Sequence, residues 1–165
     1  MRIIKKQLLC FWGTAFIIFM LTGCGIYSFS GSTLPSHIKT VAVPLFEDKT
    51  TEFGIDQKFT DGLIDAIIED NTLKIADPRS ADALVRGEIL RIEDRAGQYN
   101  AQEAASDYRV TITAKVAFED VKKRQILWEE TWSQWGSYTD DREEGIDEAV
   151  KKLSTEILNR TVSGW

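Results

Sequence analysis

The sequence predicts an α/β (α+β) two-layer sandwich, in which a mixed four-stranded sheet carries two helices on one face. Residues 108–119 alternate apolar and polar side chains, a pattern typical of a strand whose sheet has one covered and one open face. Stretches around residues 55–68 and 140–157 repeat apolar side chains at helical spacing. Because the third strand offers only one apolar face, we expect both helices to cover the same side of the sheet.

Residues 1–23 have the composition of a secretory signal peptide. A basic start, at Arg2, Lys5 and Lys6, precedes an apolar run over residues 8–21. That run is too short to span a bilayer comfortably, since a spanning helix needs about 20 apolar residues. It ends in Leu21-Thr22-Gly23-Cys24, which resembles a bacterial lipobox. We therefore expect cleavage before Cys24 and acylation of its thiol and of the new amino terminus. The alternative is an ordinary signal peptide followed by a chance cysteine.

The mature chain is expected to consist of a lipidated tether, residues 24–37, and a single domain, residues 38–165. Loss of the signal peptide with its three basic residues leaves 17 basic against 26 acidic residues, a net charge of −9. Such a chain should not bind nucleic acid, and an anionic membrane surface should repel it, so the lipid must provide membrane attachment. Cys10 lies in the signal peptide and Cys24 is acylated, so no thiol remains for a disulfide.

The first strand is predicted over residues 39–46, a β-branched and apolar run with Pro44 near its end. Residues 47–51 are predicted to form a polar turn. The first helix follows, with apolar positions at Ile55, Phe59, Leu63, Ala66 and Ile67. Asp70 and Asn71 are expected to end it.

The second strand is predicted over residues 83–92, and a loop of small and polar residues over 94–107. The alternating third strand comes next, followed by a charged hairpin turn over residues 121–125. The fourth strand is predicted over residues 126–135. We place Ile126, Trp128 and Trp132 on its core side, because they share one face in a period of two.

The last helix begins at Asp140 and Glu143, which are spaced as in a capping box. Acidic residues lie in its first turn and basic residues further along, as the helix dipole favours. The predicted order is therefore β-α-β-β-β-α, with the first two strands parallel across the first helix.

The usual catalytic and metal-binding residue sets are missing. His37 is the single histidine, and it lies beside the tether rather than on a rigid element. With no free thiol we expect no metal site of the usual zinc type, and no glycine-rich phosphate loop follows a strand. We therefore predict no enzyme, no catalytic residues and no cofactor. A glycosidase carboxylate pair remains a minor alternative, because solvated surfaces explain the acidic residues.

Two basic groups are candidate contacts for phosphate: Lys122, Lys123 and Arg124 in the hairpin turn, and Arg91 and Arg95 around the end of the second strand. The alternative for both groups is that they are polar because they are solvated. Two aromatic residues, Trp135 and Tyr138, are candidate partner contacts at the end of the fourth strand. They could equally fold onto their own domain.

Five segments together resemble the LptE family of lipopolysaccharide-assembly lipoproteins. They are Cys24-Gly25-Ile26-Tyr27-Ser28-Phe29, Val41-Ala42-Val43-Pro44-Leu45-Phe46-Glu47-Asp48-Lys49-Thr50, Phe59-Thr60-Asp61-Gly62-Leu63, Ala81-Asp82-Ala83-Leu84-Val85-Arg86-Gly87-Glu88-Ile89 and Leu127-Trp128-Glu129. Asp48 stands where that family commonly has asparagine. The resemblance implies a plug inside the outer-membrane barrel LptD, which helps the barrel assemble and assists lipopolysaccharide passing to the outer leaflet. Gly25 after the lipidated cysteine favours outer-membrane sorting.

Two other functions remain open. A lipoprotein that activates a periplasmic cell-wall synthase can share a small α/β domain and a lipid anchor, but it usually needs a long linker. Residues 25–36 reach at most about 40 Å when extended, which favours work close to the membrane. A glycan hydrolase would need a carboxylate pair that the sequence does not mark.

Overall fold

A computed structural model describes residues 34–97 and 107–163 of the chain. The predicted signal peptide, Cys24 and most of the predicted tether lie outside these residues, as does most of the predicted loop over residues 94–107. Within the described ranges, no helix combines the length and the apolar character needed to cross a membrane.

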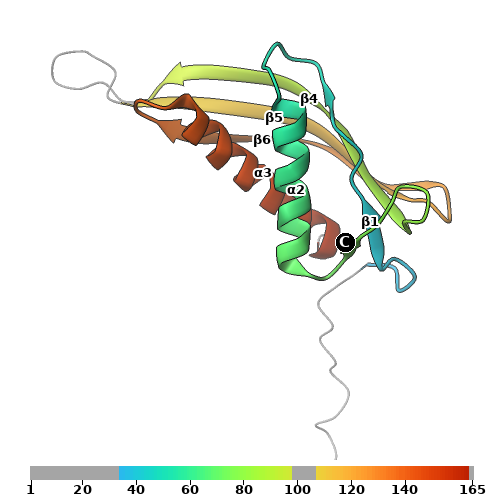
Figure 1. Cartoon of the computed structure of the whole chain (residues 1–165). Helices are drawn as coiled ribbons and strands as arrows, with labels where there is room; N and C mark the ends of the chain where they lie inside the picture. The colour runs from blue at the N-terminus through green and yellow to red at the C-terminus, as the bar shows by residue number, and fades with distance from the viewer. Residues whose placement is uncertain (1–33, 98–106, 164–165) are drawn as a thin grey trace, which may run out of the picture. The chain divides into compact units, whose positions relative to one another are not determined.

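Two helices cover one side of a mixed sheet, as Figure 1 shows. The elements in chain order are β1 Thr40–Ala42, β2 Glu47–Asp48, α2 Ile55–Asp70, β3 Lys74–Ile75, β4 Ala83–Ala96, β5 Tyr108–Asp120, β6 Gln125–Tyr138 and α3 Arg142–Ser163. The strand order is β3-β1-β4-β5-β6, with β2 paired to β4. The predicted two-layer α/β sandwich is confirmed, although the sheet has six strands rather than four.

The first predicted strand is shorter than expected, and a second short strand follows it. β1 and β2 run parallel along the same edge of β4, with Ala42 opposite Leu84 and Glu47 opposite Glu88. Between these pairs the chain has one residue more than β4 has, so it bulges away from the sheet. Pro44 lies in the bulge and has no N–H to donate to a ladder. The predicted polar turn therefore begins with a short strand.

The sequence pattern did not predict β3 or the last part of β4. β3 has two residues and adds a parallel edge beside β1, with Lys74 opposite Thr40. A strand this short carries no periodic signal. β4 continues beyond Ile92 to Ala96, where it pairs with Tyr108 at the start of β5.

β5 lies between β4 and β6 in the sheet and confirms the predicted alternation. Its fully buried apolar side chains are Val110, Ile112, Ala114, Val116 and Phe118. They pack with the helices in one apolar core. The alternation is interrupted in both neighbouring strands, because Leu90 in β4 and Leu127 in β6 have no residue opposite them in β5.

The bulge at Leu127 corrects one prediction. Trp128 is 5% exposed and Trp132 packs against the core, as predicted, but Ile126 is 51% exposed. An extra residue in a strand moves every side chain before it to the other face. Ile126 therefore lies on the open face of the sheet.

The helices confirm the predicted positions closely. α2 packs beside α3 where Gly62 faces Val150, and a Cβ at Gly62 would lie 2.6 Å from Val150 Cγ1. α2 ends at Asn71, whose left-handed backbone (φ 56°) lets its N–H reach the Ile67 carbonyl. The cap of α3 is one residue later than predicted, since Asp141 Oδ1 accepts from the Glu143 N–H at 2.9 Å.

Candidate functional site

The open face of the sheet carries a cationic patch where β4 ends and β5 begins. Arg95 of β4 lies directly opposite Arg109 of β5, and Arg91 lies opposite Thr113. The three arginines are all exposed. Directly opposed residues of antiparallel strands have Cβ atoms about 4.5–5.5 Å apart, so two like charges are held side by side. We call Arg91, Arg95, Arg109 and the neighbouring Trp135 the arginine patch.

The carboxylates near this patch do not neutralise it. Glu93 lies between two of the arginines, with Oε1 3.2 Å from Arg91 Nε and Oε2 3.4 Å from Arg95 Nη2. Arg109 forms no ion pair with any described residue, and its guanidinium carbon lies 4.3 Å from the centre of the Trp135 ring. Cation–π contact stabilises a guanidinium without cancelling its charge. Three guanidinium groups therefore face one carboxylate.

The two predicted aromatic contacts lie on opposite faces of β6. Trp135 is 39% exposed on the open face, next to Arg109, and Lys152 Nζ lies over its ring, 4.2 Å from the ring centre. Tyr138 faces the helices, half-buried, and its hydroxyl donates to Asp94 Oδ1 at 2.9 Å. The structure places Trp135 beside Arg109, which lies opposite Arg95, but it places Tyr138 on the other face.

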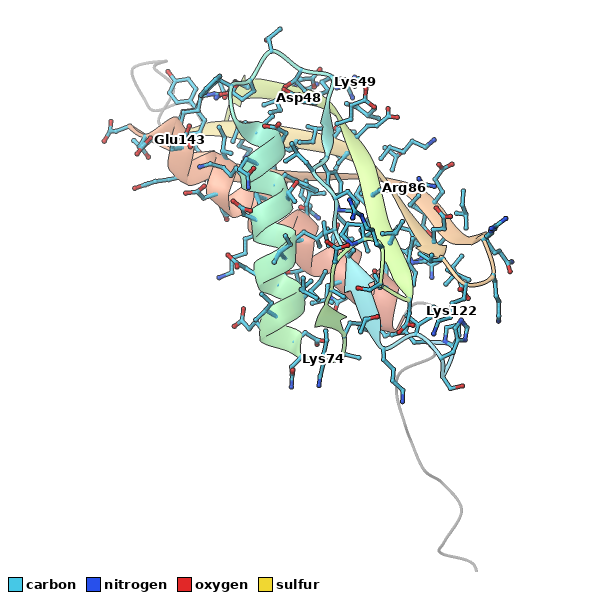
Figure 2. All side chains as sticks on the ribbon, turned by 45° about the vertical axis from the view of Figure 1, so that its right-hand side comes forward. Asp48, Lys49, Lys74, Arg86, Lys122 and Glu143 are labelled. Carbon is cyan, nitrogen blue, oxygen red and sulfur yellow. The ribbon has the colours of Figure 1, made fainter. Side chains whose placement is uncertain are left out.

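The other predicted basic group lies at the opposite end of the sheet (Figure 2). β5 separates the hairpin turn from the arginine patch by about 40 Å, at roughly 3.4 Å per residue. Lys122 Nζ is 2.6 Å from Asp82 Oδ1, and this contact, with the backbone N–H of Lys39, holds the pKa of Asp82 well below its usual range. Lys123 and Arg124 stay exposed. Part of this group therefore stabilises its own turn.

The chain enters the domain at the hairpin end. His37 Nε2 lies 2.6 Å from Oδ2 of Asp120, which is fully buried. Burial acts to raise the pKa of Asp120, but the Lys123 N–H and His37 outweigh it, so this pKa is lowered. His37 thus ties the start of the domain to the end of β5. Within the described residues, no three potential ligands gather to hold a metal ion.

An ion-pair network stands behind the arginine patch on the helix side. Arg142, at the start of α3, donates to both Asp94 oxygens at 3.0 Å and to Glu52 Oε1 at 2.9 Å. These hydrogen bonds raise the pKa of Arg142. Burial opposes ionisation of Asp94, but Arg142 and Tyr138 still lower its pKa. The network joins β4, β6, α3 and the loop before α2.

The sequence pointed to two of the three arginines and missed Arg109. Arg109 was placed on the polar side of the third strand, but nothing marked it as a neighbour of Arg95, because the register across residues 97–107 was unknown. The missing signal was the register between the second and third predicted strands: a register that pairs residues whose numbers add to 204 places residue 95 opposite residue 109.

The sequence profile of the LptE family, described as lipopolysaccharide-assembly, matches residues 38–161. The chain belongs to this family. This LptE-family protein is therefore an outer-membrane lipoprotein of the LptE type. No curated protein sequence matches it significantly.

Solved structures share its fold at low identity. A point variant of the PelC dodecamer from Paraburkholderia phytofirmans is 12% identical, with a TM-score of 0.55, and the match covers 79% of this chain and 94% of that one. The hypothetical protein CT253 from Chlamydia trachomatis is also 12% identical, with a TM-score of 0.58 and coverage of 74% and 95%.

Proposed function

We propose that this LptE-family protein is a non-enzymatic component of a lipopolysaccharide translocon. It is held in the outer membrane by lipid on Cys24, on the periplasmic side. It sits as a plug in an LptD-like β-barrel, helps that barrel assemble, and contacts lipopolysaccharide as it passes to the outer leaflet. Family membership supports the assembly role, and the arginine patch supports the glycolipid contact.

The observation that carries the glycolipid contact is the opposed pair Arg95 and Arg109. Like charges directly opposite one another in a sheet destabilise it by about several tenths of a kcal/mol. Such a pair is therefore better explained by the binding of an anion than by the stability of the fold. A phosphate between two guanidinium groups turns their repulsion into two charge-assisted attractions. The phosphates of lipopolysaccharide supply that charge, and the exposed Trp135 ring offers an adjacent apolar surface.

The position of the patch agrees with a plug. His37 fixes the tether end of the domain to the hairpin end of the sheet. The patch lies at the other end of β5, about 40 Å away. A domain anchored at the membrane by its tether can therefore hold the patch well away from the anchor, inside a barrel.

The glycolipid contact is tested by comparing two triple variants of the lipidated protein in detergent. One is Arg91→Ala/Arg95→Ala/Arg109→Ala, and the other is Lys122→Ala/Lys123→Ala/Arg124→Ala, which removes the same charge. The patch variant should bind lipopolysaccharide at least about tenfold more weakly, because one charge-assisted hydrogen bond contributes about 1.5–3 kcal/mol. The hairpin variant should bind like the wild type. The reverse result would move the contact to the hairpin turn, and unchanged binding by both would refute it.

The plug is tested separately, by affinity purification of the lipidated protein from detergent-solubilised membranes. A large β-barrel recovered in equal amounts is the expected result. Recovery of a penicillin-binding protein instead would favour the activator of cell-wall synthesis.

A further inference from the structure

The helix layer contains a groove that the arginine patch does not explain. It runs between α2 and α3 and encloses about 750 Å³. Its apolar floor includes Gly62, Ala66 and Val150. Since α2 and α3 cover the core with their other faces, this groove remains open to solvent.

The rim of the groove is acidic. Its carboxylates are Asp61, Asp65, Glu69 and Asp147, against two lysines, Lys58 and Lys151. Lys58 is already engaged, because its Nζ lies 2.6 Å from Asp147 Oδ1 and 2.6 Å from Glu143 Oε2. Asp65 and Glu69 have no ion-pair partner among the described residues, and both are exposed. The free charge of the groove is therefore negative.

The lining of the groove also contains a buried polar group without a partner. Ser154 is 1% exposed, and its hydroxyl makes no hydrogen bond to any described residue. A buried hydroxyl without a hydrogen-bond partner is energetically unfavourable. A polar group of a bound ligand would remove that cost, so Ser154 points to an occupant independently of the acidic rim.

A fully exposed aromatic residue lies at one end of the groove. Phe53 is 103% exposed and directly precedes Gly54, which lines the groove. Its turn is held by hydrogen bonds, from the Glu52 N–H to Thr50 Oγ1 at 3.1 Å and from Arg142 to Glu52 Oε1 at 2.9 Å. An exposed aromatic side chain on an ordered turn is suited to contact a partner, because the backbone that carries it does not have to be ordered on binding.

We propose that the groove and Phe53 dock a cationic segment of a protein partner, in which lysine or arginine side chains alternate with apolar ones. The basic side chains would pair with Asp65 and Glu69, and the apolar ones would cover the floor and Phe53. Charge decides the class of partner. Lipopolysaccharide and anionic lipid are repelled by this rim. The inference is separate from the glycolipid contact, because it concerns the helix layer rather than the open face of the sheet. A crosslinked peptide from the barrel would join the groove to the proposed plug, and a peptide from another protein would show a second partner.

The test uses the full lipidated chain in its native membrane, with the photo-crosslinker p-benzoylphenylalanine replacing Thr155 on the groove rim. Mass spectrometry identifies the crosslinked peptide. We expect one segment of a second protein with a net positive charge. Adducts to lipid, to another copy of this chain, or to a neutral or acidic segment would overturn the inference, as would the absence of any adduct.

Two variants and a matched control complete the experiment. Asp65→Lys/Glu69→Lys should reduce the crosslinking yield about tenfold, because it reverses the attraction. Phe53→Ser should reduce it by several fold without lowering the thermal midpoint, because the native fold buries no part of that ring. The control, Asp140→Lys/Glu144→Lys, makes the same charge change outside the groove and should leave the yield unchanged. Equal yields in all four proteins would contradict the docking site.

Discussion

Helix α3 approaches the sheet very closely at Gly136 of β6 and Gly145 of α3, and this contact leads to a specific prediction. A Cβ added at Gly136 would lie 1.9 Å from the Gly145 carbonyl oxygen and 2.9 Å from Glu148 Cβ. The nearest of these atoms belongs to backbone, which cannot swing aside like a flexible side chain. Gly136→Ala should therefore push the start of α3 away from the sheet.

The magnitude follows from that displacement. To restore even a 3.0 Å contact, α3 must move by about 1 Å, because the starting separation is 1.9 Å. Overpacking alone costs about 1–3 kcal/mol. The same movement lengthens two polar contacts that join α3 to the sheet, from the Ser137 N–H to Glu148 at 2.8 Å and from Arg142 to Asp94 at 3.0 Å. We expect a total loss of about 3 kcal/mol, which for a domain of this size is roughly a 10 °C fall in the thermal midpoint.

The assay is urea unfolding followed by tryptophan fluorescence, together with a thermal scan, on a non-acylated Cys24→Ser chain. Ser137→Ala is the control, because it removes only a 3.3 Å hydrogen bond next to the same site. The control should change the unfolding free energy by less than about 1 kcal/mol. If Gly136→Ala unfolds within 2 °C of the wild type, α3 does not pack against β6 as tightly as the contacts indicate.

Two further predictions concern polar groups. Arg142→Ala should lower the unfolding free energy by about 1–2 kcal/mol, because Asp94 and Glu52 lose their shared donor. Arg142→Lys should recover less than half of this loss, since one ammonium group lacks the guanidinium fork. Urea unfolding midpoints measure both effects. The lowered pKa of Asp82 means that the stability from its contact with Lys122 is present above the unfolded pKa, near 4, and is lost as pH falls below it. Thermal midpoints should therefore be level above about pH 5 and fall below about pH 4, with a shallower fall in Asp82→Asn, and an equal fall in the variant would contradict this linkage.

Long periodic elements were predictable from the sequence. In α2, Ile55, Phe59, Leu63 and Ile67 recur at helical spacing, and all four are buried. The alternation along β5 likewise identified its buried face. In both elements a repeated pattern over many residues outweighs any local irregularity.

Short and irregular elements were not predictable, for reasons of pairing. The two residues of β2 and of β3 become strands only because β4 and β1 supply partners. The unpaired Leu127 shifts Ile126 to the open face, and a sequence pattern alone does not reveal which strand carries a bulge.

The candidate site divides in the same way. Arg91 and Arg95 could be named from the sequence because they are basic residues close together in the chain. Arg109 could not be named from the sequence, because it becomes a candidate only through its position opposite Arg95. Lys122 shows a different limit, since the sequence names it as a candidate for phosphate but does not reveal that its ammonium also pairs with Asp82.

The arrangement of charge answers a difficulty raised by composition. The predicted mature chain, with a net charge of −9, should repel an anionic glycolipid. The arginine patch lies on the open face of the sheet, whereas Asp65 and Glu69 lie on the outer side of the helices. A helix with its side chains is about 10 Å across, and the Debye length at physiological salt is about 8 Å, so the sheet and the helix layer together separate these charges by more than one screening length. An approaching phosphate therefore meets mainly the local field of the arginines, and one small domain can present an anion-binding face and a cation-binding face at the same time.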